Sequence, residues 1–323
     1  MGESSLRVLI TGGAGFIGSH LADRLVSDGE EVLVFDDLST GNEHNFSNLV
    51  EKNSLRLVRG DIRNPRALKD CLSGINTVVH LAGITSVSRS LQNPQECAEI
   101  NVGGTSNILR ASAASGVSRF VYASSSAVYG NTNTIPISED HPLQAMSPYA
   151  ASKISGEDLC SAYDGTNELE TVCLRLFNVY GPKQGNNGYA NVIANFLEKI
   201  NLSSPLLIYG DGEQTRDFIH VRDVIDALTS VIQGHEARGT FNVGTGRRVT
   251  INYLAETILK LSHKPHQRLS HGPPRPGEVR HSQANIGRLK DRFAFAPKIQ
   301  LEQGLLEMLE DARLFRHYTS HDV

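Results

Sequence analysis

A glycine-rich turn near the start of the chain constrains the fold more than any other feature of the sequence. Leu6 to Ile10 form a short run that is apolar apart from Arg7, which is typical of a strand buried on both faces. Gly12, Gly15 and Gly18 follow with the spacing G-x-x-G-x-x-G, and apolar residues then recur at helical spacing. Glycines between a strand and a helix let backbone amides at the helix N-terminus approach a pyrophosphate closely. The alternative is a tight turn that binds no ligand.

The same alternation of strand and helix continues over the first half of the chain. Further segments have the apolar character of buried strands: EVLVFDD (31–37), LRLVRGDI (55–62), TVVHLAG (77–83), RFVYASSS (119–126) and ETVCLRLFNV (170–179). Helical patterns separate most of them, and repeated strand–helix–strand units require a parallel sheet covered by helices on both faces. The sequence therefore predicts an α/β protein with a doubly wound parallel sheet of the Rossmann type.

The character of the sequence changes after about residue 178, which indicates a second part of the molecule. Loop-like segments occupy 181–188 and 273–282, while 216–228 and 239–246 resemble further sheet and helix. We expect a large nucleotide-binding domain and a smaller C-terminal α/β domain, with some chain crossing back to the first. The predicted boundaries are 1–177 with 217–246 for the first domain, and 178–216 with 247–323 for the second.

An aspartate at the end of the second predicted strand indicates which dinucleotide the turn binds. Asp36 lies eighteen residues after Gly18, where a carboxylate accepts hydrogen bonds from the adenosine ribose and repels a 2′-phosphate. This favours NAD over NADP. The third and fourth strands end at Asp61 and Ile62 and at Leu81 to Gly83, and the carboxyl ends of such strands face the cofactor crevice.

Charge and composition exclude several classes of function. The chain has 323 residues and a formal net charge of −4, without a long basic run, so nucleic acid is not an expected partner. No signal peptide and no apolar run long enough for a membrane span occur, and the four cysteines are scattered. We therefore expect a cytoplasmic protein. The pair His317 and His321 has helical spacing but no third ligand, so no metal site is expected.

The segment SPYAASK (147–153) places a phenol and an ammonium on one helix face. Ser147 suits the helix cap and Pro148 the first helical position, so Tyr149 and Lys153 lie one turn apart. Taken alone, the pair is an ordinary surface tyrosine with a lysine neighbour. Beside a nicotinamide, however, the ammonium, the positive ring and the helix N-terminus each stabilise a phenolate. A hydroxyl from the serine cluster of YASSSAVYG (122–130) can share the proton, which makes Tyr149 a general base next to a hydride acceptor.

Together, G-x-x-G-x-x-G, the serine cluster and Y-x-x-x-K resemble the extended short-chain dehydrogenase/reductase family. Within it, the chain is most similar to the UDP-hexose 4-epimerases that accept UDP-glucose or UDP-N-acetylglucosamine. The resemblance runs from about residue 6 to about residue 310. It implies an isomerase that holds NAD permanently and forms a homodimer through helices near 95–115 and 148–163.

The resemblance also implies roles for individual residues. Ser125, Tyr149 and Lys153 match the catalytic serine, base and lysine of the family. The implied cofactor contacts are Gly12, Gly15, Phe16, Ile17, Gly18, Asp36, Asp37, Ser39, Thr40, Gly41, Asp61, Ile62, Leu81, Ala82, Gly83, Ser124, Tyr149, Lys153 and Phe177. The implied substrate contacts are Ser125, Ser126, Tyr149, Asn178, Asn191, Val192, Arg216, Arg275, Glu278 and Ser282. The two arginines also suit a diphosphate on physical grounds, because guanidinium donors match its oxygens.

The implied reaction is a redox loop. Tyr149 removes the proton of the sugar 4-hydroxyl while the C4 hydride passes to NAD⁺, the 4-keto sugar turns over, and the hydride returns to its opposite face. Related dehydratases carry Asp-Glu at the positions of Ser126 and Ala127, and related decarboxylases usually keep a glutamate at the latter. UDP-glucuronate epimerases commonly have threonine at the position of Asn178. Epimerisation of a UDP-hexose is thus the expectation, with UDP-glucuronate epimerase and dehydratase activities as alternatives.

Two further hypotheses concern the size of the substrate and the presence of catalysis. Ser282 stands at the position that gates the hexose pocket in the family, where tyrosine restricts it and a small residue admits an N-acetyl group. We therefore expect UDP-GlcNAc and UDP-GalNAc to be accepted with UDP-glucose and UDP-galactose. A non-catalytic NAD-binding regulator on the same fold is the alternative from another class, since fold alone does not establish function.

Overall fold

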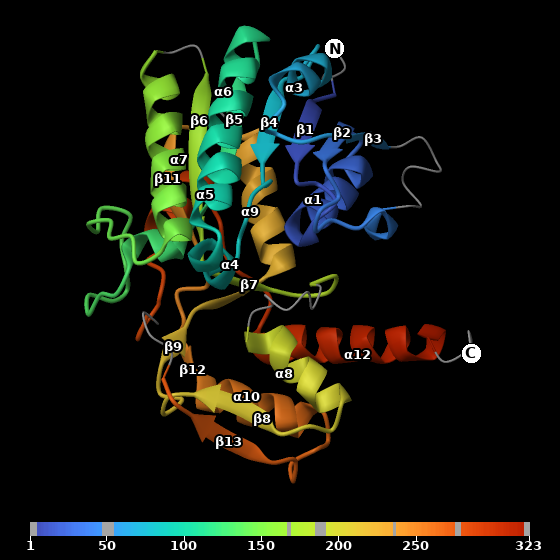
Figure 1. Cartoon of the computed structure of the whole chain (residues 1–323), viewed down its shortest axis with the longest axis vertical. Coiled ribbons are helices and arrows are strands. Elements are labelled where there is room, and N and C mark those ends of the chain that lie inside the picture. Colours follow the sequence, from blue (N-terminus) through green and yellow to red (C-terminus); the bar gives the residue numbers. More distant parts are fainter. Residues whose placement is uncertain are drawn as a thin grey trace.

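Seven parallel strands form the central sheet of the protein, in the order β11-β6-β5-β4-β1-β2-β3 (Figure 1). The computed structural model describes residues 5–46, 55–166, 169–184, 192–234, 237–274 and 279–319, the last nine of them as backbone only. The strands are β1 (Arg7–Thr11), β2 (Glu31–Asp36), β3 (Leu55–Arg59), β4 (Thr77–His80), β5 (Arg119–Ser125), β6 (Glu170–Leu176) and β11 (Gly239–Val243). Every strand pair in this sheet is parallel.

Helices cover both faces of the sheet, which confirms the predicted doubly wound fold. The helices of this part are α1 (Phe16–Ser27), α3 (Pro65–Cys71), α4 (Val87–Gln92), α5 (Pro94–Ala98), α6 (Thr105–Ala114), α7 (Pro148–Gly165), α9 (Val221–Gln233) and α11 (Gly287–Phe293). Short turns of 3₁₀ helix occupy Glu43–Asn45 and Ser126–Tyr129, and a π-helical segment, Glu99–Gly104, joins α5 to α6. Helices α1, α9 and α11 contribute to one hydrophobic cluster, and α3, α6 and α7 to the other.

The first strand shows why the sequence folds in this way. Val8 and Ile10 belong to the cluster beneath α1 and α9, whereas Leu9 belongs to the cluster beneath α3, α6 and α7. All three side chains are fully buried, as expected for a central strand between two helical layers. Each full burial of such a side chain stabilises the fold by about 2 kcal/mol before the entropy of folding is counted.

A second hydrophobic core lies below the carboxyl ends of the main strands (Figure 1). Its helices are α8 (Val192–Asn201), α10 (Ile251–Leu261) and α12 (Leu301–Thr319). Two-stranded pairs complete the fold: β7 (Asn178–Tyr180) with β10 (Phe218–His220), β9 (Thr215–Arg216) with β12 (Val249–Thr250), and β8 (Leu206–Tyr209) with β13 (Leu269–Gly272). Between these elements the chain returns to the main sheet, where α9 packs on α1 and β11 pairs with β6. The predicted domain boundaries themselves stay a prediction.

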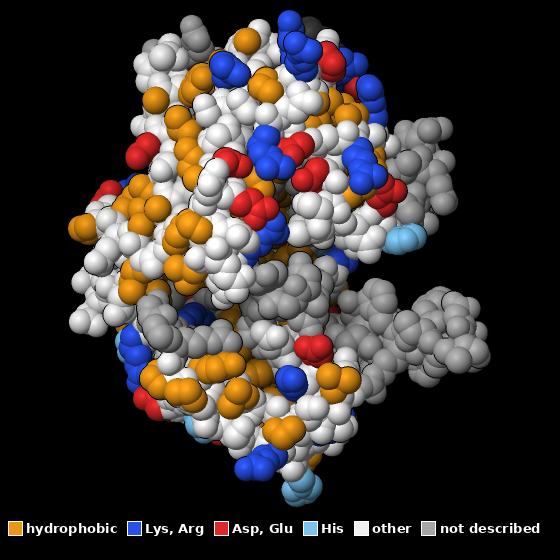
Figure 2. Space-filling model, in the orientation of Figure 1, with side chains coloured by type: hydrophobic (Ala, Val, Ile, Leu, Met, Phe, Trp, Pro, Cys, Tyr) orange, Lys and Arg blue, Asp and Glu red, His pale blue; other side chains and the backbone are white. Residues whose placement is uncertain are grey.

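The distribution of surface charge and the character of the helices can be compared with the expectations about nucleic acid and membrane spans. Figure 2 shows Lys and Arg side chains interspersed with Asp and Glu over the sheet-containing part of one face, without a field of one sign. None of the helices in the described part of the chain is both long and apolar enough to cross a bilayer.

Candidate active site

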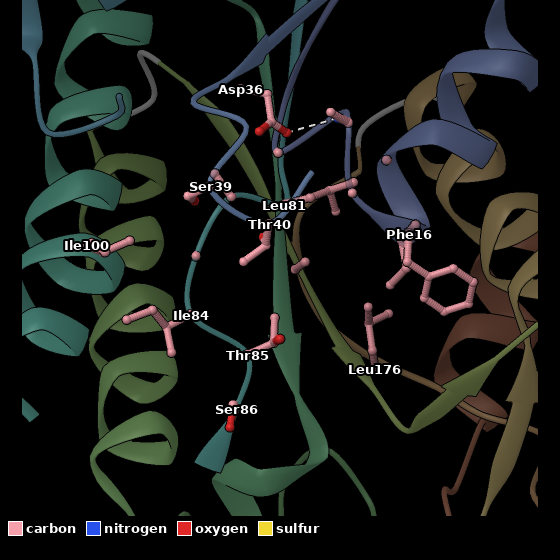
Figure 3. Close-up of a pocket in the computed structure, with 18 of the residues that line it drawn as sticks. Phe16, Asp36, Ser39, Thr40, Leu81, Ile84, Thr85, Ser86, Ile100 and Leu176 are labelled. Atoms are coloured by element: carbon pink, nitrogen blue, oxygen red, sulfur yellow. Dashed lines mark hydrogen bonds between the residues drawn. The ribbon is translucent and has the colours of Figure 1, made fainter. Parts of the chain in front are cut away.

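A cavity of about 650 Å³ runs along the carboxyl ends of the main strands. Figure 3 shows its side chains, with Asp36 toward one end and Thr85 and Ser86 toward the other. Most of the sequence-predicted contacts line it together: Gly12, Gly15, Phe16, Ile17, Gly18, Asp36, Asp37, Ser39, Thr40, Asp61, Ile62, Leu81, Ala82, Gly83, Ser124, Ser125, Tyr149, Lys153, Phe177 and Asn178. Residues at or just beyond the carboxyl ends of six strands, β1 to β6, therefore converge on one cavity.

The glycine-rich turn approaches its neighbours too closely for any other residue. Gly12 has a φ of +69°, and a Cβ built on it lies 2.6 Å from the backbone nitrogen of Ala82. A Cβ on Gly18 lies 2.5 Å from the carbonyl oxygen of Gly12. Gly15 caps α1 without a side-chain hydrogen bond, so no side chain competes with a ligand for the first amides of the helix. This is the cradle that a pyrophosphate requires.

Asp36 is held in place at the end of β2 by two backbone amides. The Ala14 N–H donates to Oδ2 (2.9 Å), and the Leu38 N–H donates to Oδ1 (2.8 Å). Figure 3 shows one hydrogen bond of the Asp36 carboxylate as a dashed line. Burial raises the pKa of the carboxyl, and these two hydrogen bonds oppose the rise. The remaining lone pairs of the carboxylate face the cavity that it lines, which fits two ribose hydroxyls of NAD.

Helix α7 begins as the sequence predicts and presents the expected pair to the cavity. The Ala150 N–H donates to the Ser147 hydroxyl (3.1 Å), and Pro148 is the first helical residue. Tyr149 and Lys153 are both buried and line the cavity. The Lys153 ammonium donates to the carbonyl oxygen of Ala123 (2.7 Å) and lies 6.0 Å from the centre of the Tyr149 ring. The phenol and the ammonium are thus brought together, as expected.

The electrostatics of this pair differ in one respect from the sequence-based expectation. Burial is the largest influence on the Tyr149 phenol and raises its pKa, while a hydrogen bond with the Ser125 hydroxyl lowers it. Burial also lowers the pKa of Lys153 to about 8. Desolvation therefore opposes activation of the phenol, and a phenolate at neutral pH depends on positive charge close to it. Lys153 supplies one such charge, and the ring of oxidised NAD is suited to supply the second.

Some predicted residues do not line the cavity. Gly41, Ser126, Val192, Arg216 and Ser282 are not among the residues that line the described cavity. Asn191, Arg275 and Glu278 lie outside the described residues, so their predicted roles stay predictions. Ser282 is buried, and its N–H donates to the carbonyl oxygen of Thr215 (3.1 Å), one residue before Arg216. The predicted substrate contacts Arg216 and Ser282 are therefore close in space. Their neighbours Thr215 and His281, 66 positions apart in the sequence, also share a side-chain hydrogen bond (3.0 Å).

The cavity also has walls that sequence reasoning missed. They include Asn42, Asn45, Ile84, Thr85, Ser86, Arg89, Ile100, Lys183 and Gln184. Asn45 donates to the carbonyl oxygen of Ala14 (2.9 Å) and accepts from the Lys183 ammonium through its own carbonyl oxygen (3.0 Å). Most of these residues lie in the segments that follow β2, β4 and β7, and that position beyond strand ends was the signal that could have found them. Arg89 and Ile100 lie in helical segments, where no such signal exists.

Known proteins resemble the chain over almost its whole length. The sequence model described as the NAD dependent epimerase/dehydratase family matches residues 8–244. A UDP-glucose 4-epimerase of Mycolicibacterium smegmatis is 36% identical over 94% of this chain and 98% of its own. The solved UDP-glucose 4-epimerase of Thermotoga maritima, with UDP-glucose, has a TM-score of 0.91 at 32% identity, covering 96% of this chain and 100% of that one. The UDP-N-acetylglucosamine 4-epimerase of Methanobrevibacter ruminantium, in complex with UDP-N-acetylmuramic acid, has a TM-score of 0.92 at 33% identity (97% and 100% covered).

Relatives with other names match at a similar level, so similarity alone does not select the substrate. A UDP-glucuronic acid decarboxylase of Arabidopsis thaliana is 32% identical over 97% of this chain and 71% of its own. A dTDP-glucose 4,6-dehydratase of Streptomyces niveus is 32% identical over 94% and 92%. The cradle at the start of α1, the carboxylate of Asp36 and the extent of these matches agree on the cofactor, NAD. The chain belongs to the NAD dependent epimerase/dehydratase family.

Proposed function

We propose that the protein inverts C4 of a UDP-hexose, interconverting UDP-glucose with UDP-galactose and UDP-GlcNAc with UDP-GalNAc. The observation that carries this proposal is the composition of the cavity around Tyr149. Among the described residues that line it, the carboxylates are Asp36, Asp37 and Asp61, which follow β2 and β3 at the end suited to adenosine. Tyr149 is accompanied instead by hydroxyls and by Lys153.

The residues of this chain account for the proton steps of such a reaction. When bound, NAD supplies a reversible hydride acceptor. Tyr149 acts as general base toward the sugar 4-hydroxyl, and the Ser125 hydroxyl, which shares a hydrogen bond with the phenol, relays the proton. The Ala123 carbonyl oxygen holds Lys153 so that its charge stabilises the phenolate. After the flat 4-keto sugar has turned over, the same phenol returns the proton, so protons and electrons balance over one cycle.

The elimination and decarboxylation reactions of the family need groups that these positions do not supply. A dehydratase needs an acid and a base close to C5 and C6 of the sugar, and the family's Asp-Glu pair corresponds here to Ser126 and Ala127. Both residues belong to the 3₁₀ turn that follows β5. A hydroxyl and a methyl group cannot exchange protons with carbon acids at neutral pH, which favours epimerisation.

A panel of substrates tests this proposal directly. Purified protein with NAD is incubated with UDP-glucose, UDP-GlcNAc, UDP-glucuronate and dTDP-glucose, and the products are separated and identified. We expect 4-epimers of the first two, in amounts that approach an equilibrium mixture. Loss of carbon dioxide from UDP-glucuronate, or loss of water from dTDP-glucose, with no 4-epimer from either UDP-hexose would contradict the proposal.

The uridine diphosphate is proposed to bind where the two parts of the molecule meet. Asn178 lines the cavity next to the nicotinamide end, and Arg216 follows from β9 in the smaller part. We infer that residues 178–216 and 247–323 bind the UDP-sugar and the remaining residues bind NAD. Assembly into a homodimer through 95–115 and 148–163, which cover α5, α6 and most of α7, is part of the same proposal.

The size of the residue at position 282 is expected to decide whether N-acetylated sugars are accepted. Ser282→Tyr should abolish most turnover of UDP-GlcNAc and leave that of UDP-glucose within about a factor of ten, because a phenol ring fills space that an acetamido group needs. The measurement is kcat/KM for both substrates. Ser282→Ala is the matched control, since it changes the same buried site without adding bulk, and should spare both activities. Equal effects of Ser282→Tyr on both substrates would exclude this role.

A further inference from the structure

Three residues on one face of α7 each contact the end of β5. Tyr149, Lys153 and Glu157 follow one another at intervals of four, so they lie above one another on the helix. Tyr149 shares a hydrogen bond with the Ser125 hydroxyl, and Lys153 donates to the carbonyl oxygen of Ala123 (2.7 Å). The Glu157 carboxylate accepts from the hydroxyl of Ser124, the residue between these two. The helix is thereby joined to three consecutive residues of the strand, and only the first two of these contacts involve the proposed chemistry.

Glu157 is fixed from its other side by an arginine of β6. Arg175 makes a two-pronged contact, with Nε 2.9 Å from Oε1 and Nη2 2.6 Å from Oε2 of the carboxylate. Nη1 of the same guanidinium donates to the Tyr129 hydroxyl and to the carbonyl oxygen of Glu139, both at 2.9 Å. The side chains of Arg175 and Glu157 are 6% and 7% exposed, so the pair is almost free of water. Four hydrogen bonds fix the orientation of the planar guanidinium. Because two of them go to Glu157, they also fix the orientation of the carboxylate.

We propose that Glu157 is a positioning residue, which with Arg175 fixes the register of α7 on β5 and thereby the placement of Tyr149 and Lys153 against Ser125. The Tyr149 N–H also donates to the Ser90 hydroxyl (3.2 Å) and Asn101 donates to the Ser152 hydroxyl (2.9 Å), but these contacts join α7 to other helical segments and not to β5. Among the contacts with β5, the third, at Glu157, opposes a pivot of the helix about the first two. Proton transfer is sensitive to displacements of this kind, since a shift of about 1 Å at a reacting group costs about a hundredfold in rate. The expected loss of turnover when Glu157 is replaced rests on the proposed function. The expected change in the pKa of the Tyr149 phenol does not.

A second ion pair across the same two strands provides a matched control. Arg119 and Glu170 face each other in the β5–β6 register, as Ser124 and Arg175 do five residues further along. The guanidinium of Arg119 contacts the Glu170 carboxylate at 2.8 Å, with side chains 13% and 25% exposed, at the far edge of the sheet from the cavity. Glu170→Gln thus weakens the same strand pair without touching α7.

The pKa of the Tyr149 phenol depends on its distance from Lys153 and Ser125, so it can be used to measure the placement of Tyr149 without any sugar substrate. The protein has nine tyrosines and no tryptophan, so ultraviolet titration of the NAD-loaded protein, minus that of its Tyr149→Phe variant, isolates this phenol. Titratable groups face Tyr149 or Lys153 from every neighbouring element: Cys97 from α5, Tyr122 from β5, His80 from β4, Glu157 and Cys160 from α7, and Cys173 from β6. Removing the negative charge of Glu157 alone would lower the pKa of the phenol, whereas loosening its contact with Lys153 and Ser125 would raise it.

We expect Glu157→Gln to raise the titration midpoint of Tyr149 by about one pH unit and to lower kcat about a hundredfold, with KM and NAD content nearly unchanged. Ser124→Ala leaves both charges in place and should act in the same direction to a smaller extent. Glu170→Gln should lower thermal stability and leave the midpoint where it is. Because Glu157→Gln leaves a buried guanidinium without its partner, the protein carrying it can fail to fold, and Ser124→Ala then decides the question.

Several outcomes would overturn the positioning role. They are a midpoint that falls or does not move in folded Glu157→Gln, an unmoved midpoint in Ser124→Ala, or an equal rise in Glu170→Gln. If the unaltered protein converts no UDP-hexose, the proposed function fails, and the phenol titration still tests the role of Glu157. The two failures are therefore distinguishable in one set of variants.

Discussion

Replacing Tyr149 with phenylalanine is expected to lower the turnover of UDP-hexoses about a thousandfold while NAD stays bound. The substitution removes one hydroxyl from a buried ring and leaves the cradle at Gly12 to Gly18 and the carboxylate of Asp36 intact. Among the described residues that line the cavity, Tyr149 is the only tyrosine, so without its hydroxyl the proposed base is lost; the rate falls and cofactor affinity does not. Product formation with time and the NAD content of the purified variant measure the two effects.

Tyr122→Phe is the matched control for this variant. The Tyr122 ring lies under the same ammonium, with Lys153 Nζ 4.9 Å from its centre, but its buried hydroxyl has no hydrogen-bond partner among the described residues. Its removal should change turnover by less than about threefold, since no hydrogen bond is lost. Equal activity of Tyr149→Phe and Tyr122→Phe would contradict the assignment of the base. If the unaltered protein and its variants all bind NAD fully and none turns over a UDP-hexose, the alternative of a non-catalytic NAD-binding regulator would be favoured.

The second large effect is expected at the glycine-rich turn, where Gly18→Ala should destabilise the protein by about 3 kcal/mol and reduce its NAD content. The added Cβ lies 2.5 Å from the carbonyl oxygen of Gly12 and 2.6 Å from Cα of Gly13. These are backbone atoms of the turn itself, so relief requires α1 to move away from β1. That movement opens the cradle and separates the amides from a pyrophosphate. Denaturant unfolding and bound NAD after gel filtration give the two quantities.

Gly165→Ala is the corresponding control for stability. Gly165 is the last residue of α7, and a Cβ there meets no atom within 4 Å. Alanine is a better helix former than glycine, so stability should stay the same or rise by up to about 1 kcal/mol. A loss of stability in Gly165→Ala as large as that in Gly18→Ala would show that the close approach at the turn is not the cause.

The main sheet could be predicted because its strands leave a strong signal in the sequence. Runs such as Val8 to Ile10 and Phe120 to Ala123 are apolar without alternation, as expected of strands covered on both faces. Strand ends then identify the cavity, since Asp36, Asp61 and Ser125 follow directly from them. The capped start of α7 was likewise readable, because Ser147 and Pro148 act through local geometry.

The features that the sequence did not reveal depend on contacts between distant residues. The pair β7 with β10 joins Asn178 to Phe218 through strands of three residues each, which are too short to show a period. The Lys183 contact with Asn45 spans 138 positions. Arg175 lies inside an apolar strand, and no local sequence pattern indicates that Glu157, on α7, pairs with its charge. Side-chain chemistry of this kind becomes visible only when the fold brings the partners together.

The central claim, that hydrogen leaves C4 of a UDP-hexose and returns to the same carbon from the other side, can be tested with UDP-glucose carrying deuterium at C4. The NAD-loaded protein is incubated with this substrate in ordinary water, and the product is examined by mass spectrometry and NMR. The account predicts UDP-galactose with the deuterium retained at C4 and no solvent hydrogen there. A product that has lost water, or one whose C4 hydrogen comes from solvent, would contradict it.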